Sequence, residues 1–303
     1  MEKRFDFVVK TGKMVYGIET NFYGSQGSKL NETARSYKTL ALEANTIQGF
    51  TFVWFTDGKG WSKAKHNLEE TFDVMTTHWS FPSRGSWATH DAKWRGNWSP
   101  YIPRNVILRY SKENDLVLDQ FAGGGTTLVE AKLLNRDIIG VDINDVALKR
   151  CREKINFEHE GADGHVYLNK GDARNLPFVQ DESIDLICTH PPYANIIGYS
   201  EDIDGDLSRL DIKDFLKEMN PVASECYRVL KKGKFCAILM GDTRRKGHMV
   251  SLAFDVMKVF ESAGFKLKEI IIKEQHNCKA TGYWKTNSVK YNFLLIAHEY
   301  LFV

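Results

Sequence analysis

The strongest constraint on the fold is a regular alternation of short apolar runs with amphipathic segments after residue 112. Apolar runs with the length of buried strands occur at 116–118, 137–141, 166–168, 184–188, 235–240 and 265–273. Segments with helical spacing lie between them, among them 126–134, 146–155, 212–230 and 249–263. Such alternation is typical of a doubly wound, mostly parallel sheet, so we expect an α/β fold here.

A change in composition near residue 80 divides the chain. All seven prolines lie at position 82 or later, and four of the seven tryptophans fall between 79 and 98. Before this point the pattern predicts strands at 5–10, 14–22 and 50–55 and helices at 30–44 and 61–75. We therefore expect a small α/β segment over 1–81, a Trp-rich basic linker with a lead-in helix over 82–112, and the main α/β domain over 113–303.

Composition excludes several classes of protein. No apolar run approaches about 18 residues, so no transmembrane helix is expected. The first residues, MEKRFD, lack the apolar core of a secretion signal. The five cysteines are scattered and form no CxxC pair, which argues against a zinc knuckle and favours a reducing compartment. We expect a cytoplasmic protein without a membrane segment.

Charge is unevenly distributed, although the formal net charge is only +2. Residues 82–112 carry a net charge of +5, residues 113–243 carry −9, and residues 244–303 again carry +5. Two basic segments around an acidic middle fit a phosphate-facing surface around a site for a cationic ligand. The alternative is that the charged residues cluster by chance on solvated faces. The tryptophans of 82–112 fit either stacking on nucleic-acid bases or packing in the core.

A glycine-rich turn, DQFAGGGTT over 119–127, follows the first strand of the α/β domain. Glycine lets the backbone turn tightly and approach a ligand closely. An acid leads the turn, and the spacing is D-x-F-x-G-x-G rather than G-x-G-x-x-G, which suits a ligand with a cationic amino acid end. A plain tight turn is the alternative.

Two further acids, Asp142 and Asp172, end the next two predicted strands. A carboxylate at the first of these positions can bind both ribose hydroxyls, and one at the second can accept from an adenine amine. Each alone could be a loop acid or a helix cap. Together with Asp119, at three successive strand ends, they predict a nucleoside pocket.

A proline pair follows the buried run 184–188, in the sequence His190-Pro191-Pro192-Tyr193. Consecutive prolines fix the backbone and leave the preceding carbonyls able to face a ligand. Tyr193 can stack on a flat base. The plainer alternative is a strand-end turn with a packed tyrosine.

The Asp119-x-Phe-x-Gly-x-Gly125 and His190-Pro-Pro-Tyr193 pair resembles the exocyclic-amino DNA methyltransferases, which act on N6 of adenine or N4 of cytosine. The resemblance covers about 82–303 and implies a Rossmann-like S-adenosylmethionine-dependent methyltransferase fold, with double-stranded DNA as partner. The order of the two motifs along the chain, with the cofactor loop before the proline motif, resembles the gamma arrangement of the family. The catalytic positions that it implies are His190, Pro191, Pro192 and Tyr193. The cofactor-binding positions that it implies are Trp98, Pro100, Asp119, Phe121, Gly123, Gly125, Thr126, Thr127, Asp142, Ile143, Asp172 and Ala173.

The sequence departs from the family at His190, where Asp, Asn or Ser is usual. A neutral imidazole can accept a hydrogen bond from an amine, so the chemistry is retained, but the usual sign of adenine or cytosine is lost. No Pro-Cys dipeptide supplies a nucleophile for methylation at cytosine C5. No large insert follows the proline motif, so the site-reading segment is expected in 198–211, in 273–290 or at the N-terminus.

The first 81 residues resemble the C-terminal part of type II restriction endonucleases that cut GATC. The matching strings are RFDFV at 4–8, GIETNFY at 17–23, GSKLNETARSY at 27–37 and TDGKGW at 56–61. Asp6 and Glu19, on adjacent predicted strands, are the carboxylates that could hold Mg²⁺. Asn21 stands where the nuclease pattern has lysine, with Lys29 as a candidate substitute. We expect an inactive remnant without a metal site.

The sequence therefore predicts an S-adenosylmethionine-dependent DNA methyltransferase of restriction–modification type. Adenine N6 is preferred over cytosine N4 only because of the GATC resemblance. An RNA or protein-amide methyltransferase with the same motif, and a DNA-binding fusion without turnover, are the alternatives. Monomer and homodimer remain open.

Overall fold

The computed structural model describes residues 5–12, 14–22, 50–57, 76–158, 162–200, 202–276 and 279–303, with the single positions 37, 40, 44 and 47. The chain forms two compact units, Met1–Thr76 and Thr77–Val303. In the described part of the chain, no helix has the length and apolar character needed to cross a bilayer.

The first unit contains a three-stranded sheet in the order β1 (Phe7–Lys10), β2 (Val15–Phe22) and β3 (Phe50–Asp57). The first two strands form the predicted antiparallel hairpin, and β3 runs parallel to β2. The Thr11 hydroxyl closes the hairpin turn by donating to the Met14 carbonyl, 3.1 Å away. The expected helices at 30–44 and 61–75, and with them Lys29, lie almost entirely outside the described residues.

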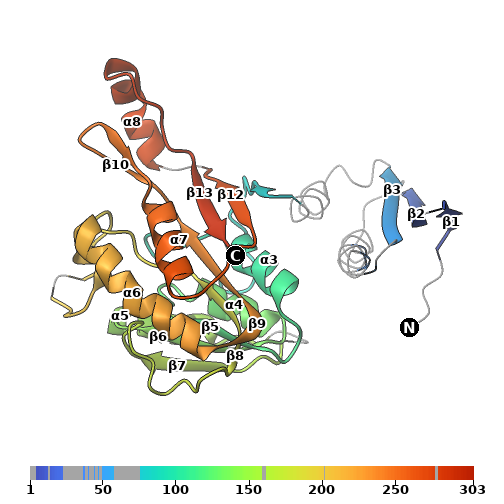
Figure 1. The fold of residues 1–303 in the computed structure, drawn as a ribbon, viewed down its shortest axis with the longest axis horizontal. Coiled ribbons are helices and arrows are strands. Elements are labelled where there is room, and N and C mark those ends of the chain that lie inside the picture. Colours follow the sequence, from blue (N-terminus) through green and yellow to red (C-terminus); the bar gives the residue numbers. More distant parts are fainter. Residues whose placement is uncertain are drawn as a thin grey trace. The chain divides into compact units, whose positions relative to one another are not determined.

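The second unit is built on one eight-stranded sheet. Figure 1 shows its strands with helices packed around them. Its strand order is β4-β12-β13-β9-β8-β5-β6-β7. The bounds are β4 His78–Trp79, β5 Leu116–Asp119, β6 Asp137–Asp142, β7 Val166–Lys170, β8 Ile184–Thr189, β9 Leu230–Met240, β12 Ile270–Glu274 and β13 His298–Phe302. Strands β7, β6, β5, β8 and β9 are parallel, and only β13 is antiparallel to both of its neighbours. The predicted doubly wound, mostly parallel sheet is confirmed.

Helices cover both faces of this sheet. Their bounds are α3 Tyr101–Tyr110, α4 Thr126–Leu133, α5 Asp145–Ile155, α6 Ile212–Val229 and α7 Leu252–Ser262. A further helix, α8 (Lys279–Lys290), projects away from the sheet (Figure 1). One buried cluster joins α6 and α7 to strand residues such as Leu118 and Ile187, and another joins α3 and α4 to Val117 and Leu186. Successive side chains of a strand point to opposite faces of the sheet, so neighbouring residues are buried in different clusters. Because both faces are buried, the strands read as uninterrupted apolar runs in the sequence.

The structure differs from the prediction at the C-terminal part of the sheet. The expected helix over 249–263 begins only at Leu252, because 248–250 forms β11, which pairs with β10 (Thr243–Arg245) in a hairpin. The expected strand over 265–273 begins at Ile270. Strand β4 also joins the large sheet, next to β12, while the predicted domain boundaries at 81/82 and 112/113 remain proposals.

Candidate active site

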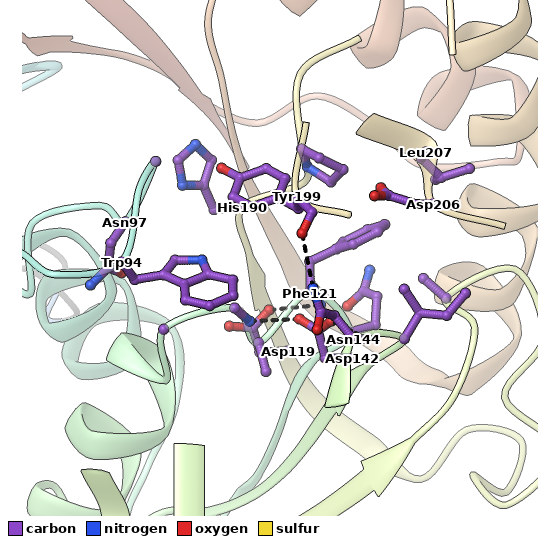
Figure 2. Close-up of a pocket in the computed structure, with 18 of the residues that line it drawn as sticks. Trp94, Asn97, Asp119, Phe121, Asp142, Asn144, His190, Tyr199, Asp206 and Leu207 are labelled. Carbon is purple, nitrogen blue, oxygen red and sulfur yellow. Dashed lines mark hydrogen bonds between the residues drawn. The ribbon is translucent and has the colours of Figure 1, made fainter. Parts of the chain in front are cut away.

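A cleft with an empty volume of about 830 Å³ lies where the parallel strands β5, β6, β7 and β8 end. Ligands of open α/β sheets bind at this edge. Figure 2 shows the labelled side chains converging on it, with Trp94 and Asn97 on one side and Asp206 and Leu207 on the other. The sequence-predicted residues that line it are Trp98, Asp119, Phe121, Gly123, Asp142, Ile143, Asp172, Ala173, His190 and Pro192.

Six other predicted residues do not line the cleft: Pro100, Gly125, Thr126, Thr127, Pro191 and Tyr193. The structure gives several of them a supporting place. Gly125 precedes α4 with a φ of +77°, a left-handed conformation that favours glycine. The Thr127 hydroxyl donates to Asp119, and the Thr126 hydroxyl donates to Asn97. The roles predicted for all of these residues remain predictions.

The glycine-rich turn leaves no space for larger side chains. A Cβ at Gly124 would lie 2.8 Å from the Cβ of Trp94, and one at Gly123 would lie 3.2 Å from the Trp94 indole nitrogen. Gly123 also has a φ of +49°. The turn needs glycine because the segment before α3 packs directly against it.

Asp119 is almost fully buried at the end of β5. One carboxylate oxygen accepts from the Phe121 N–H at 3.1 Å and the Thr189 hydroxyl at 2.8 Å, while the other accepts from Thr127. Burial raises the pKa of Asp119 to about 6, opposed by these hydrogen bonds and reinforced by nearby Asp142. A cation in the cleft would stabilise the ionised form.

Asp142, at the end of β6, holds two backbone segments together. One oxygen accepts from the Gly123 N–H at 2.8 Å and the other from the Asn144 N–H at 2.9 Å. Burial raises the pKa of Asp142, and those N–H groups act in the opposite direction. Each carboxylate oxygen has a second acceptor position, so Asp142 can take hydrogen bonds from a ligand while keeping the turn in place.

Asp172 behaves differently from the other two acids. Arg174 donates to both of its oxygens from Nε, each at 3.0 Å, and from Nη2 at 2.6 Å. Arg174 also pairs with Glu218 on α6. Partial burial would raise the pKa of Asp172, but the Arg174 hydrogen bonds hold it below its usual value. Asp172 therefore reaches the cleft as an ionised acceptor with part of its capacity already used.

His190 forms the wall of the cleft beyond the end of β8. Its ring stacks on the buried Trp98 indole at a centroid distance of 5.3 Å and an angle of 26°. Burial, with weaker contributions from Lys273 and Arg84 against Glu299, lowers the pKa of His190 to about 4, so the imidazole is neutral at physiological pH. His190 Nε2 lies 3.1 Å from the hydroxyl of Tyr193.

Residues 82–112, which the sequence predicts to be a linker, are held to the rest of the second unit by a buried glutamate. Glu130 on α4 accepts from the Trp87 indole at 2.6 Å and from Arg104 at 2.9 Å, and it lies 2.6 Å from His90 Nε2. Arg84 donates to the carbonyl of Trp98 at 2.9 Å. For Trp87 and Trp98 these contacts favour core packing over nucleic-acid stacking.

Several cleft residues were missed by sequence reasoning. Trp94 and Tyr199 stack with an interplanar angle of 10° across the cleft, and a Cβ on Gly96 would lie 2.0 Å from the Tyr199 hydroxyl. The Asn144 amide donates to the Tyr199 carbonyl at 3.1 Å. Burial raises the pKa of Tyr199 to about 12. The clustered tryptophans were the available signal, because Tyr199 lies 105 positions from Trp94 and 55 positions from Asn144 along the chain.

The first unit uses its two candidate metal ligands in other ways. Asp6 accepts from the Thr20 N–H at 2.7 Å and from the Thr20 hydroxyl at 3.1 Å. Buried Glu19 accepts from the Tyr37 hydroxyl at 2.8 Å. Within the described ranges, no group of three or more His, Cys, Asp or Glu side chains could hold a metal ion.

Three family models match parts of the chain. Residues 117–197 match a methyltransferase domain and residues 184–303 match a DNA methylase, so these two matches span the cleft. Residues 1–83 match the DpnII restriction endonuclease. Together with the fold, these matches identify a Rossmann-like methyltransferase domain behind a DpnII-like segment, both related to restriction–modification proteins.

Individual relatives cover only parts of the chain. The type II restriction enzyme DpnII of Streptococcus pneumoniae is 60% identical over 73 residues, which are 24% of this chain and 25% of that enzyme. The type II methyltransferase M2.DpnII of the same organism is 39% identical over 80 residues, 25% of this chain and 30% of that protein. The tRNA (guanine(10)-N2)-dimethyltransferase of Methanothermobacter thermautotrophicus is 34% identical over 122 residues, 40% of this chain and 34% of that enzyme. The chain thus spans about a quarter to a third of these relatives.

A solved S-adenosylmethionine-dependent methyltransferase from Methanosarcina mazei aligns with 65% of this chain and 94% of its own, at 15% identity and a TM-score of 0.46. The family matches support S-adenosylmethionine as the cofactor, and the residues present fit it. The glycine turn would face its amino acid end, Asp142 has free acceptor positions for its ribose hydroxyls, and Asp172 remains an acceptor for its adenine.

Proposed function

We propose that the protein methylates the exocyclic amine of a base in double-stranded DNA, as the modification component of a restriction–modification system. The observation that carries the proposal is that a single cleft is lined both by residues of the predicted cofactor site and by residues of the proline motif. Asp119 and Asp142, beside the glycine turn, line the same cleft as His190 and Pro192 of the proline motif. A methyl donor and a flat acceptor would meet between them.

S-adenosylmethionine, when bound, supplies an electrophilic methyl group. The target amine is inaccessible inside a duplex, so the base has to rotate out of the stack. The neutral His190 imidazole, which lines the cleft, would accept an amine hydrogen and help to orient the lone pair. The Pro191 carbonyl and the Tyr193 ring, which do not line the cleft, would contact the base once its entry exposes them. Catalysis then rests on positioning and on preorganised dipoles, since none of these residues has to form a covalent bond.

A basic projection beside the proline motif supports a nucleic-acid substrate. Figure 1 shows β10 and α8 extending from the same end of the second unit. Residues 243–250 and 275–298 together carry six Lys/Arg and no Asp or Glu. Arg244 donates to the Leu294 carbonyl at 3.2 Å, and Arg245 donates to the Asn195 carbonyl at 3.0 Å, which links the projection to the loop after Tyr193. Such a surface can pair with phosphates flanking a flipped base.

The DpnII-like first unit favours DNA over other substrates, and the GATC resemblance favours adenine N6 over cytosine N4. RNA methylation is the second candidate, because the match to a tRNA dimethyltransferase, over 122 residues, is longer than those to DpnII and M2.DpnII, over 73 and 80 residues. A binding protein without turnover is a third, and it fits the intact cleft least well.

Incubation with tritiated S-adenosylmethionine and either unmodified duplex DNA or total tRNA, followed by nucleoside chromatography, tests the proposal. We expect label in DNA as N6-methyladenosine, or less favourably as N4-methylcytidine, in their deoxy forms. Tyr193→Ala and Asp119→Ala should abolish transfer, and Tyr167→Ala, at an exposed position on β7, is the matched control. Label confined to tRNA, or full activity of both cleft variants, contradicts the proposal.

A further inference from the structure

Four polar side chains, linked in a chain by hydrogen bonds, lead from strand β12 to the wall of the cleft. Lys273 on β12 and Glu299 on β13 are register partners, and the Lys273 ammonium donates to Glu299 Oε2 at 2.8 Å. The Tyr193 hydroxyl donates to Glu299 Oε1 at 2.8 Å. His190 Nε2 lies 3.1 Å from the same hydroxyl.

The direction of each hydrogen bond in this chain is determined by its charged end. Glu299 is ionised because, although burial opposes it, Lys273 holds its pKa below the usual value. An ionised carboxylate only accepts, so the Tyr193 hydroxyl has to use its single hydrogen on Glu299. The bond between Tyr193 and His190 then requires a hydrogen on Nε2, and in a neutral imidazole Nδ1 is left as an acceptor.

We propose that Lys273 and Glu299 are positioning residues that hold His190 in its Nε2–H tautomer, so that Nδ1 accepts one hydrogen of the target amine. The proposal rests on the proposed function for the identity of the amine. It accounts for histidine at a position where a side-chain oxygen would otherwise be the acceptor. An imidazole can replace that oxygen only if its tautomer is fixed.

The surroundings of His190 are consistent with this role. Stacking on Trp98 fixes the plane of the ring, and within the part of the chain that the structure describes no hydrogen bond to Nδ1 is found. His190 also lines the cleft, whereas Tyr193 does not. Nδ1 therefore keeps its acceptor position on a residue that lines the cleft.

Glu299→Gln provides a nearly isosteric test. The carbonyl of the introduced amide would turn toward the Lys273 ammonium, so its NH₂ group would face Tyr193. The Tyr193 hydroxyl would then donate to His190 Nε2, and the imidazole proton would move to Nδ1. Glu274→Gln, on the neighbouring strand β12, is the matched control because Glu274 does not join the chain.

The tautomer is measured without substrate, by long-range ¹H–¹⁵N correlation spectra of protein labelled at histidine. His190 is identified by the signal lost in His190→Asn. We expect the Nε2–H tautomer in the wild type and in Glu274→Gln, and the Nδ1–H tautomer in Glu299→Gln. A wild-type Nδ1–H tautomer overturns the inference whatever the protein methylates, so this result is separate from failure of the proposed function.

Methylation kinetics give the second readout. Loss of one preorganised hydrogen-bonding partner costs about 10²-fold or more in kcat, so we expect a fall of that size in Glu299→Gln with unchanged cofactor affinity. In a His190→Asn background, where the acceptor is a carbonyl oxygen without tautomers, the same substitution should have little effect. An equal loss in both backgrounds would assign Glu299 a merely structural role. Should Glu299→Gln fail to fold, Tyr193→Phe should leave His190 in a mixture of tautomers, and retention of pure Nε2–H would contradict the proposal.

Discussion

The two units of the chain each bring a pair of carboxylates to neighbouring strands, but at different positions along those strands. In the first unit Asp6 and Glu19 lie at neighbouring strands, and each is held by a neutral donor, Thr20 or Tyr37. In the second unit Asp119 and Asp142 are the last residues of β5 and β6, where they hold the backbone of a glycine turn and border a cleft. Asp6 instead precedes β1 and Glu19 lies inside β2, so only the second pair stands at the carboxyl ends of parallel strands, where open α/β sheets bind ligands.

The largest difference between the two pairs should appear in cofactor affinity. Asp142→Ala removes a charged acceptor for two ribose hydrogen bonds, each worth about 1.5–3 kcal/mol, so we expect at least a 100-fold weaker Kd for S-adenosylmethionine by calorimetry. Asp6→Ala, in the first unit, should leave the Kd unchanged. Similar losses in both variants would mean that the two pairs do not differ in function.

Asp119→Asn should separate binding from stability. The pKa of Asp119 is about 6 in the folded protein against 3.8 in the unfolded chain, so the folded state binds the extra proton and loses stability as pH rises through this window. The asparagine variant avoids this loss. At pH 7 its free energy of unfolding should exceed the wild type's by up to about 3 kcal/mol, and the difference should vanish below pH 4. Urea titrations at both pH values measure it, and a less stable variant at pH 7 would contradict the electrostatic account.

Because the Asp119 carboxyl has a raised pKa, we expect binding of S-adenosylmethionine to depend on pH. A cationic ligand favours ionised Asp119, so below pH 6 the carboxyl has to release a proton before it can bind. We expect affinity for S-adenosylmethionine to fall about 10-fold per pH unit below 6 and to be flat above 7. The slope should disappear in Asp119→Asn, and its persistence there would assign it to another group.

The smallest effect should come from the first unit. Glu19→Gln converts a hydrogen bond to a charged acceptor into a neutral one, and we expect a loss of about 1 kcal/mol in local stability, measured by hydrogen exchange in β2. Methylation should not change. Mg²⁺ should neither protect these amides nor support plasmid nicking, and metal-dependent protection that disappears in Glu19→Gln would mean that the pair is a working metal site.

The predictable part of this protein is its local pattern. The apolar runs predicted the parallel strands, because these strands are buried on both faces. The glycines ahead of a helical segment predicted the turn after β5. Strand β13 was missed because buried Glu299 interrupts its apolar pattern, and its partner Tyr193 lies 106 residues away. The contact between Trp94 and Tyr199 was also missed, because tertiary packing brings together two residues that are far apart in the sequence. The hydroxyls of Thr126 and Thr127 donate to Asn97 and Asp119, and the ligand contacts predicted for these two residues stay predictions.

Strand β4 has a consequence for how such a domain stays free of aggregates. Its two residues pair with β12, the Ile272 N–H donates to the Thr77 carbonyl at 2.7 Å, and Trp79 is buried. A shortened chain that began at Pro82 would leave the backbone groups of β12 unpaired, beside the exposed side chains of Ile270 and Ile272. An open, apolar edge of this kind is a template for edge-to-edge association between molecules. The few residues before the linker therefore protect the sheet from self-association.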